Sequence, residues 1–185
     1  AMTSVDLDYL KKAAALKASE FVRSGMVVGL GTGSTAKHLL VALGEQVKAG
    51  MKLRGVPTSQ ETAVLAKQAG IPLIDAENRW EIDVAIDGAD QVDPHFNLIK
   101  GGGGALLKEK IVAASAKQFI VMVDHTKQVP VLGGSFPLPI EVIPFGWGST
   151  AREIEGLTKS RVVLRERNGA PFRTEAGNLI VDVHI

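Results

Sequence analysis

The sequence predicts an α/β protein built on a doubly wound parallel sheet, with a smaller α+β domain appended to it. Two observations favour this class. Up to about residue 124, short apolar runs alternate with segments of helical periodicity, as in parallel strands joined by crossover helices. Beyond that point the chain becomes rich in proline and glycine, which indicates a different architecture. We therefore expect a Rossmann-like α/β domain at residues 2–130 and an α+β domain at residues 131–185.

The expected elements of the first domain follow in order along the chain. Residues 7–22 place leucine, alanine and phenylalanine at helical spacing with lysines between them, which predicts an amphipathic helix. Apolar runs typical of strands buried on both faces of a sheet lie at residues 26–30, 52–57, 71–75, 83–87 and 118–124. Helical segments lie between them at residues 34–50, 59–70 and 104–117. Ligands of such a sheet bind beyond the C-terminal ends of its strands.

The second domain is expected to carry a hairpin. Proline and glycine are concentrated at residues 129–148, a short helix is expected at residues 149–157, and strands are expected at residues 160–167 and 177–185. The sequence stops inside the last of these strands. We therefore expect the α+β domain to be incomplete at its C-terminus.

Composition excludes several classes of function. Lys and Arg total 21 against 20 Asp and Glu, so a net charge of +1 gives no overall field that attracts nucleic acid or an anionic membrane. The chain has no cysteine, which excludes disulfides and thiolate chemistry, and its four histidines lack the spacing of a metal site. There is no signal-peptide pattern and no apolar run near the ~20 residues of a membrane helix. We expect a cytoplasmic protein without a metal, a nucleic-acid partner or a membrane partner.

The stretch GLGTGSTAKHLL, residues 29–40, connects an expected strand to an expected helix. Unpaired N–H groups at a helix N-terminus attract phosphate, glycines let the main chain approach the anion, and Ser34 and Thr35 add hydroxyl donors. The spacing Gly31, Gly33, Ala36 also fits the loose dinucleotide pattern, but the second strand ends in Thr58 and Ser59 rather than in an acidic residue that would hold a ribose. The P-loop pattern is absent. A tight turn without a ligand remains the structural alternative.

A second group of residues surrounds four consecutive glycines. Asp87 ends an expected strand, Asp90 follows it, Lys100 precedes the glycines, and Glu109 lies about one turn inside the next helix. Singly, the aspartates fit Asx turns and the glutamate fits a first-turn acid. Together they form a set suited to proton abstraction next to a carbonyl: a carboxylate base, and a lysine with backbone donors for the developing oxyanion. Lys127 follows another strand end, where it either adds positive charge to the phosphate pocket or faces solvent.

The ordered motifs GLGTGST, TSQETA, IDGADQVD, LIKGGGGALLKEKI, DHTKQV, LPIEVIPF and TEAGNLIVDV closely resemble ribose-5-phosphate isomerase of the A type, from the first helix through Ile185. The resemblance implies the interconversion of ribose 5-phosphate and ribulose 5-phosphate in the non-oxidative pentose phosphate pathway, with no cofactor and no metal. It implies that the domain at residues 2–130 is catalytic and that the protein is a homo-oligomer, a dimer or tetramer. The family continues for a few dozen residues past the position of Ile185.

The resemblance also assigns site residues. Glu109 matches the base that moves a proton between C1 and C2 through an enediolate. Our hypothesis is that Asp87 serves ring opening and hydroxyl proton transfer, and that Lys100 and the glycine amides stabilise the enediolate oxygens. The residues that match substrate-binding positions are Thr32, Gly33, Ser34, Thr35, Asp87, Gly88, Ala89, Asp90, Lys100, Gly101, Gly102, Gly103 and Lys127.

Two rival interpretations come from other classes. A related enzyme such as glucosamine-6-phosphate deaminase is similar in architecture, but no motif favours an amino sugar. A sugar-phosphate sensor would carry a DNA-binding helix-turn-helix and a basic patch, and neither is visible in the sequence.

Overall fold

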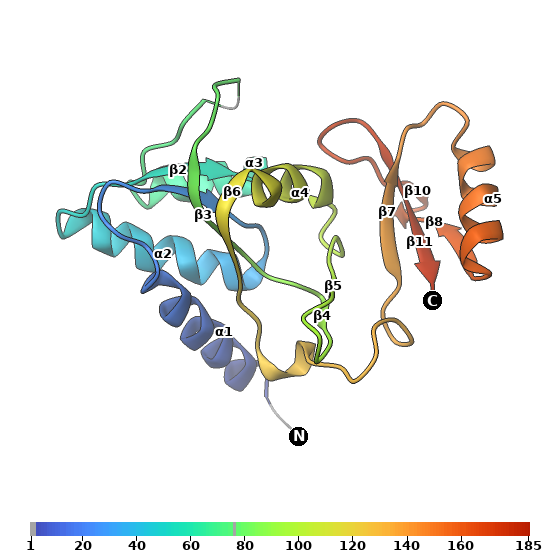
Figure 1. The fold of residues 1–185 in the computed structure, drawn as a ribbon, viewed down its shortest axis with the longest axis horizontal. Coiled ribbons are helices and arrows are strands. Elements are labelled where there is room, and N and C mark those ends of the chain that lie inside the picture. The colour runs from blue at the N-terminus through green and yellow to red at the C-terminus, as the bar shows by residue number, and fades with distance from the viewer. Residues whose placement is uncertain (1–2, 76) are drawn as a thin grey trace. The chain divides into compact units, whose positions relative to one another are not determined.

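The computed structural model describes residues 3–75 and 77–185 (Figure 1). The chain forms two compact units. Unit 1 comprises Ala1–Gly88 and Leu107–His125, and unit 2 comprises Ala89–Leu106 and Thr126–Ile185. The chain therefore passes from unit 1 to unit 2 inside the motif IDGADQVD and returns inside GGGGALLKEKI. The boundary expected between residues 130 and 131 stays a prediction.

Unit 1 is a four-stranded parallel sheet with the strand order β2-β1-β3-β6. The central strands β1 and β3 are almost wholly buried, whereas the edge strand β6 is largely exposed. The elements are α1 (Ser4–Ser19), β1 (Val27–Leu30), α2 (Ser34–Lys48), β2 (Arg54–Pro57), α3 (Gln60–Gln68), β3 (Ile82–Asp87), α4 (Leu106–Ser115) and β6 (Ala116–Val121). In register, Val28 pairs with both Gly55 and Val84. The predicted doubly wound α/β fold is confirmed.

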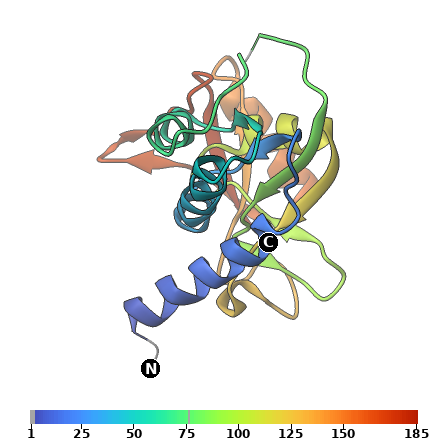
Figure 2. The same ribbon diagram turned by 90° about the vertical axis from the view of Figure 1, so that its left-hand side faces the viewer.

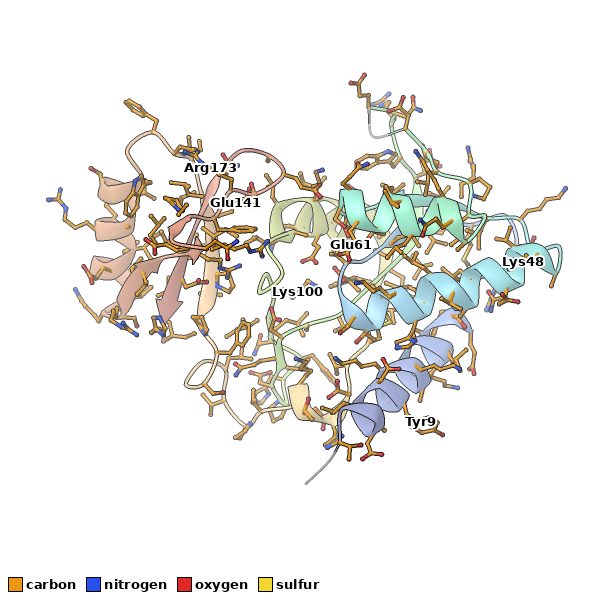
Figure 3. The ribbon with its side chains drawn as sticks, turned by 180° about the vertical axis from the view of Figure 1, so that it is seen from behind. Tyr9, Lys48, Glu61, Lys100, Glu141 and Arg173 are labelled. Carbon is orange, nitrogen blue, oxygen red and sulfur yellow. The ribbon has the colours of Figure 1, made fainter. Side chains whose placement is uncertain are left out.

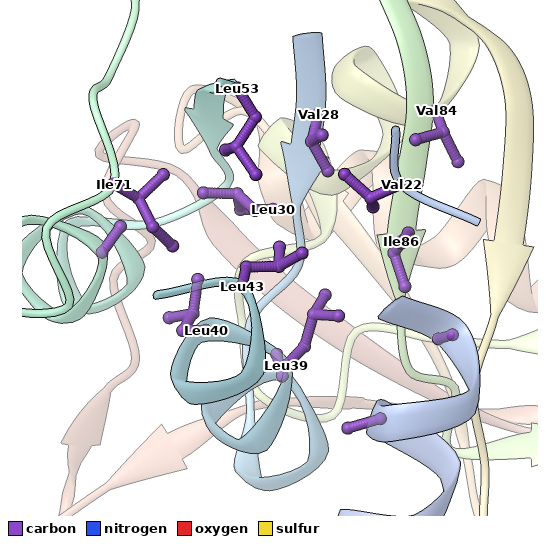
Figure 4. Packing of buried hydrophobic residues seen from close by; sticks show 14 of the residues in the cluster. Val22, Val28, Leu30, Leu39, Leu40, Leu43, Leu53, Ile71, Val84 and Ile86 are labelled. Atoms are coloured by element: carbon purple, nitrogen blue, oxygen red, sulfur yellow. The ribbon is translucent and has the colours of Figure 1, made fainter. Parts of the chain in front are cut away.

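Helices cover both faces of this sheet. On one face, Leu39 and Leu43 of α2 and Ala15 of α1 pack with Val28 and other alternate residues of the central strands (Figure 4). Helices α1 and α2 lie side by side on this face, as Figure 2 shows. On the other face, Val112 of α4 packs against neighbouring strand residues in a separate cluster. Adjacent residues of a strand point to opposite faces of the sheet. The central strands are therefore buried on both faces, as their continuous apolar sequences predict.

One expected strand is absent, and that prediction was wrong. Residues 71–75 form a single parallel bridge, from Leu73 to Gly55, instead of a strand. Two hydrogen bonds attach this segment to β2, from Gly55 N–H to the Pro72 carbonyl at 2.8 Å and from Ile74 N–H to the Gly55 carbonyl at 2.9 Å. Pro72 has no N–H to donate, and the chain turns at Asp75, which accepts a hydrogen bond from Asn78. The segment is therefore too short to extend the sheet.

Unit 2 contains a three-stranded antiparallel sheet with the order β7-β11-β8. One face of this sheet packs against Trp147, Ala151 and Ile154 of the helix α5, which lie at helical spacing. Two short hairpins accompany it, β4 with β5 and β9 with β10. The elements are β4 (Gln91–Val92), β5 (Leu98–Ile99), the 3₁₀ turn η1 (His125–Lys127) at the boundary of the units, β7 (Leu138–Val142), α5 (Trp147–Thr158), β8 (Arg161–Leu164), β9 (Glu166–Arg167), β10 (Ala170–Pro171) and β11 (Leu179–His184).

Within the described residues 3–75 and 77–185, no helix has both the length and the apolar character needed to cross a lipid bilayer.

Candidate active site

The glycine loop lies between β1 and α2, as predicted. Gly33 is the N-cap of α2 and has a φ of 112°, a conformation that suits glycine. Because glycine has no side chain, it cannot cap the first N–H groups of the helix, and these groups carry the positive end of the helix dipole. Gly33 and Ser34 are exposed, and Lys11 of α1 donates to Ser34 Oγ at 3.0 Å. The loop thus presents backbone donors and a hydroxyl group to solvent beside a cation, which suits a phosphate.

Asp87 is the last residue of β3, and its side chain is almost fully buried, with 4% exposed. Its Oδ1 accepts hydrogen bonds from the backbone N–H groups of Thr32 at 3.2 Å and of Gly88 at 2.8 Å. A Cβ atom at Gly31 would overlap this carboxylate. The glycine at position 31 therefore lets the strand end of β3 bring Asp87 against the loop after β1.

Three buried hydroxyl groups stabilise the loop from the side of β2 and α3. The Thr58 hydroxyl donates to the Leu30 carbonyl and the Thr62 hydroxyl to the Gly31 carbonyl, both at 2.8 Å. Ser59 caps α3 by accepting from Thr62 N–H at 3.1 Å, and its hydroxyl donates to Thr62 Oγ1 at 3.0 Å. Thr58 and Ser59 follow β2, at the position where a dinucleotide site would need an acidic residue. In the structure they bind the protein's own glycine loop.

Thr32 joins this network to the carboxylate. Its hydroxyl donates to Ser59 Oγ at 2.8 Å and lies 2.8 Å from Thr58 Oγ1, which already donates to a carbonyl. Its backbone N–H donates to Asp87. A threonine hydroxyl has one proton, so both donors of Thr32 are used inside the protein. Thr32 is thereby placed to hold Asp87 and the loop in fixed positions.

Glu109 lies in the first turn of α4 and is buried, with 8% exposed. Its side chain and that of Asp87 line the same small pocket of unit 1, together with Gly31, Thr58 and the apolar side chain of Val112. The pocket begins where β1, β2 and β3 end, the edge at which ligands of doubly wound sheets bind. Two carboxylates beside an apolar wall are an arrangement suited to proton transfer, because a positioned carboxylate can take a proton from carbon and return it.

The remaining predicted residues lie in unit 2 or at its border. Lys100 is half-buried on the segment between β5 and α4, where Figure 3 labels it. Asp90 precedes β4, its N–H donates to the Ile99 carbonyl at 2.8 Å, and its Oδ2 accepts from Gly102 N–H at 2.8 Å. The four glycines form a tight turn closed by a hydrogen bond from Gly104 N–H to the Gly101 carbonyl at 3.0 Å. Asp90 therefore orients the glycine turn within its own unit.

Lys127 is the last residue of η1 and belongs to unit 2. Its side chain is half-buried. Among the residues that the structure describes, no group of three or more His, Asp or Glu side chains has the geometry to hold a metal ion.

Sequence comparison assigns the chain to a family. Residues 54–185 match the family model of ribose 5-phosphate isomerase A (phosphoriboisomerase A). The chain belongs to the ribose-5-phosphate isomerase A family. Ribose-5-phosphate isomerase A of Bradyrhizobium diazoefficiens is 50% identical over 191 residues, covering 98% of this chain and 79% of the relative. The protein of the same name from Nitrobacter hamburgensis is 52% identical over 185 residues, covering 97% of this chain and 79% of the relative.

Solved structures of ribose 5-phosphate isomerases superpose closely on this chain. A D-ribose-5-phosphate isomerase in complex with phospho-erythronic acid superposes with a TM-score of 0.91 at 42% identity, covering 97% of this chain and 80% of that structure. The ribose 5-phosphate isomerase from Plasmodium falciparum gives a TM-score of 0.91 at 39% identity, covering 96% and 79% of the two chains. The resemblance inferred from the motifs is thus confirmed, and family membership decides against the dinucleotide, deaminase and sensor interpretations.

Proposed function

We propose that this member of the ribose-5-phosphate isomerase A family interconverts D-ribose 5-phosphate and D-ribulose 5-phosphate, the aldose–ketose isomerisation of the non-oxidative pentose phosphate pathway. The observation that carries the proposal is that two buried carboxylates, Asp87 at the end of β3 and Glu109 in the first turn of α4, line the same narrow crevice of unit 1 at the C-terminal edge of the sheet. Surface acids of a first helical turn are normally solvated, whereas Glu109 is buried.

In the proposed reaction, the Glu109 carboxylate removes the C2 proton of open-chain ribose 5-phosphate. The electron pair forms the C1–C2 double bond, and the C1 carbonyl oxygen becomes an enediolate oxygen. Glu109 then returns its proton to C1, while the proton of the C2 hydroxyl is transferred to the C1 oxygen, so that the C2 ketone and the C1 hydroxyl form together. Asp87, held by two backbone N–H groups, serves ring opening and hydroxyl proton exchange.

The developing negative charge requires donors that are in place before the reaction. We assign this role to Lys100 and to the backbone N–H groups of Gly101 and Gly103, while the N–H of Gly102 donates to Asp90 and supports the turn that carries them. These residues enter the proposal because they lie in the family motifs IDGADQVD and LIKGGGGALLKEKI. No metal or organic cofactor has a role in this mechanism.

The phosphate of the substrate is assigned to the N-terminus of α2. Gly33, Ser34 and Thr35 supply N–H and hydroxyl donors there, and the helix dipole favours the dianion. Thr32 acts by fixing the loop, because its own donors are engaged. Gly88 and Ala89 continue the Asp87 loop along the sugar, and Lys127 adds a cation for the substrate.

We also propose a homo-oligomer, a dimer or tetramer, in the cytoplasm. Phe145, Leu157 and Ile143 of unit 2 are 94%, 84% and 70% exposed, and apolar side chains of this size are enriched at interfaces between subunits. Light scattering behind size-exclusion chromatography measures the assembly, and a monomer at micromolar concentration would contradict it. The location follows from the substrate, because a phosphorylated sugar is charged and does not cross membranes unaided.

The proposed base is tested by Glu109→Gln, which keeps the shape of the side chain and removes its basicity. We expect kcat to fall by about a thousandfold or more, in line with the loss of a carboxylate that performs every proton transfer at carbon, while the affinity for phospho-erythronic acid changes by less than about threefold. Activity is followed by a coupled assay of ribulose 5-phosphate formation with EDTA present. The matched control is Glu153→Gln, on the exposed side of α5.

Isotope incorporation gives an independent measurement. Isomerisation in D₂O should place deuterium on C1 of ribulose 5-phosphate, because the proton on the base exchanges with solvent. A Glu109→Gln variant with more than a tenth of the wild-type kcat would refute the assignment of the base. Activity that disappears with EDTA would refute the metal-free mechanism.

A further inference from the structure

Arg165 follows β8 in unit 2. It lies outside all the sequence motifs that contribute residues to the proposed reaction. Its guanidinium is largely buried, with 15% of the side chain exposed, and pairs with Asp182 of β11, whose side chain is 16% exposed. The Nε atom donates to Asp182 Oδ2 at 2.9 Å, and Nη2 donates to Oδ1 at 2.6 Å. This two-point pairing fixes the plane of the guanidinium, and the neighbouring strands β8 and β11 fix both backbones.

The same guanidinium reaches the glycine turn. Nη1 donates to the carbonyl of Gly101 at 3.0 Å and to the carbonyl of Gly102 at 3.1 Å. Gly101 and Gly102 precede Arg165 by 64 and 63 positions in the sequence. Arg165 therefore connects a rigid sheet to the turn that carries the proposed oxyanion donors.

Because the peptide bond is planar, these contacts at the carbonyl oxygens also fix the direction of the N–H groups of the next residues. In a trans peptide the C=O of one residue and the N–H of the next point in opposite directions. The peptide between Gly101 and Gly102 is held at both ends, by Arg165 at its carbonyl and by Asp90 at its N–H. The peptide between Gly102 and Gly103 is held by Arg165 at its carbonyl alone, so the N–H of Gly103 must point away from the guanidinium.

Gly103 is placed to receive a ligand atom. It is exposed, and a Cβ atom built on it would meet no other atom within 4 Å. By contrast, a Cβ at Gly102 would lie 2.7 Å from Phe136 and 2.8 Å from Asp90 Oδ1. Among the described hydrogen bonds of the turn, the N–H of Gly103 donates to no protein acceptor.

We infer that Arg165 is a positioning residue of the isomerase reaction: by gripping the carbonyls of Gly101 and Gly102, it presets the Gly103 N–H as a donor to the enediolate oxygen. The inference rests on the proposed function, because it concerns the donors assigned to that intermediate. A preset donor needs no reorganisation when charge develops, which is the condition for effective oxyanion stabilisation. Loss of Arg165 should therefore affect the transition state more than the ground state.

The test removes the guanidinium without leaving a buried charge alone. The double variant Arg165→Gln with Asp182→Asn keeps two hydrogen-bonding side chains and no net charge, whereas Arg165→Lys keeps the charge but lacks the fork that reaches a carboxylate and two carbonyls together. We expect kcat to fall by about ten- to a hundredfold in the double variant, somewhat less than the loss of a whole donor, with KM within about threefold. Arg165→Lys should fall between this variant and the wild type. Arg161→Gln, an exposed arginine on β8, is the control and should keep the wild-type kcat.

Inhibitor binding separates positioning from general damage. Phospho-erythronic acid carries a planar carboxylate whose two oxygens resemble those of the enediolate, so we expect its Ki to rise by about the same factor as kcat falls, because both would report the same donor. The Ki of inorganic phosphate should stay within about twofold, because the phosphate site is assigned to other residues. Exogenous guanidinium should restore part of kcat in Arg165→Ala at a temperature well below its unfolding midpoint.

The outcomes are distinct. A double variant with kcat within twofold of wild type overturns the inference, and so does a loss of kcat matched by an equal loss of phosphate affinity. If the wild type is active, Glu109→Gln is inactive and the double variant is unimpaired, the proposed function stands and the role of Arg165 fails. If Glu109→Gln is active while the double variant loses kcat and inhibitor affinity together, the base is wrong and Arg165 keeps its role. A wild type inactive on pentose phosphates overturns both.

Discussion

Substitution of Gly31 by alanine tests how closely the Asp87 carboxylate is fitted to the glycine loop. A Cβ at this position would overlap Asp87 Oδ1 and would lie 2.7 Å from Asp87 Cα, whereas ordinary contact begins at 3.4 Å. Relief by side-chain rotation is not available, because one of the atoms belongs to the backbone of β3. The ends of β1 and β3 must therefore separate by about 0.7 Å, a distance large enough to affect positioning.

Two effects follow from this displacement. Overpacking of a well-packed site costs about 1–3 kcal/mol of unfolding free energy, and a misplacement of about 1 Å lowers the rate by up to about a hundredfold. The hydrogen bonds from Gly31 N–H to the Ile86 carbonyl and from the Thr62 hydroxyl to the Gly31 carbonyl lie in the strained region and limit its relaxation. We expect kcat of Gly31→Ala to fall by about ten- to a hundredfold by the same reasoning.

The measurements are urea unfolding and steady-state kinetics in the coupled isomerase assay. The matched control is Gly156→Ala in α5, where a Cβ meets nothing within 4 Å and alanine should add about 0.5–1 kcal/mol of helix stability without changing kcat. A Gly31→Ala enzyme with kcat within twofold of wild type would show that the close fit of the carboxylate to the loop has no role in the reaction.

Two further predictions concern stability. Thr62→Val leaves the Gly31 carbonyl without its buried hydroxyl donor and should lower the unfolding free energy by about 1–3 kcal/mol; an unchanged urea midpoint would contradict the hydroxyl network. The hydrogen bond from Lys117, together with that from Val27 N–H, lowers the pKa of Asp83 below its ordinary value. A lowered pKa gives stability that is present above the ordinary value and is lost as the pH falls through the folded value, so Asp83→Asn should flatten the fall in melting temperature below about pH 4, and an unchanged acid profile would refute the linkage.

The sheet of unit 1 could be predicted because its strands are buried on both faces, which makes them continuous apolar runs separated by amphipathic helices. Strand β7 of unit 2 could not be predicted, because it contains Pro139 and lies inside the stretch in which proline and glycine are concentrated. Proline is tolerated there since β7 pairs with β11 alone and is an edge strand. For residues 71–75 the error was the reverse, because a strand was predicted and is absent. The segment has the composition of a strand, but its short length and Pro72 permit only a single bridge.

The candidate site divides in a similar way. Asp87 and Glu109 could be found because acids at a strand end and in a first helical turn stand out against an apolar pattern. Arg165 and Thr62 could not, because their partners lie 64 and 31 positions away in the sequence. Such residues look like ordinary surface or helix residues until the fold brings their partners together. The sequence thus indicates the groups proposed to contact the substrate more readily than the groups that position them.

The glycines of the site also acquire a different explanation from the one the sequence suggests. Their expected role is close approach to a ligand, yet two of them are required by the protein's own carboxylates. A Cβ at Gly31 would collide with Asp87, and a Cβ at Gly102 would collide with Asp90. In each pair the missing side chain lets an aspartate accept from backbone N–H groups, of Thr32 in the first pair and of Gly102 itself in the second.

The pairing of glycines with aspartates indicates that the glycine-rich loops are restrained by the protein itself. A loop whose N–H groups donate to a buried carboxylate such as Asp87, or to a half-buried one such as Asp90, is restrained, and a preset oxyanion or phosphate site requires this restraint. Gly103 differs from the other glycines of the turn, because it has neither a φ in the left-handed region nor a neighbour that excludes a side chain. Neither backbone conformation nor packing therefore requires glycine at position 103. The arrangement of Arg165 supports another reason, which is that a substrate oxygen closely approaches the Gly103 N–H.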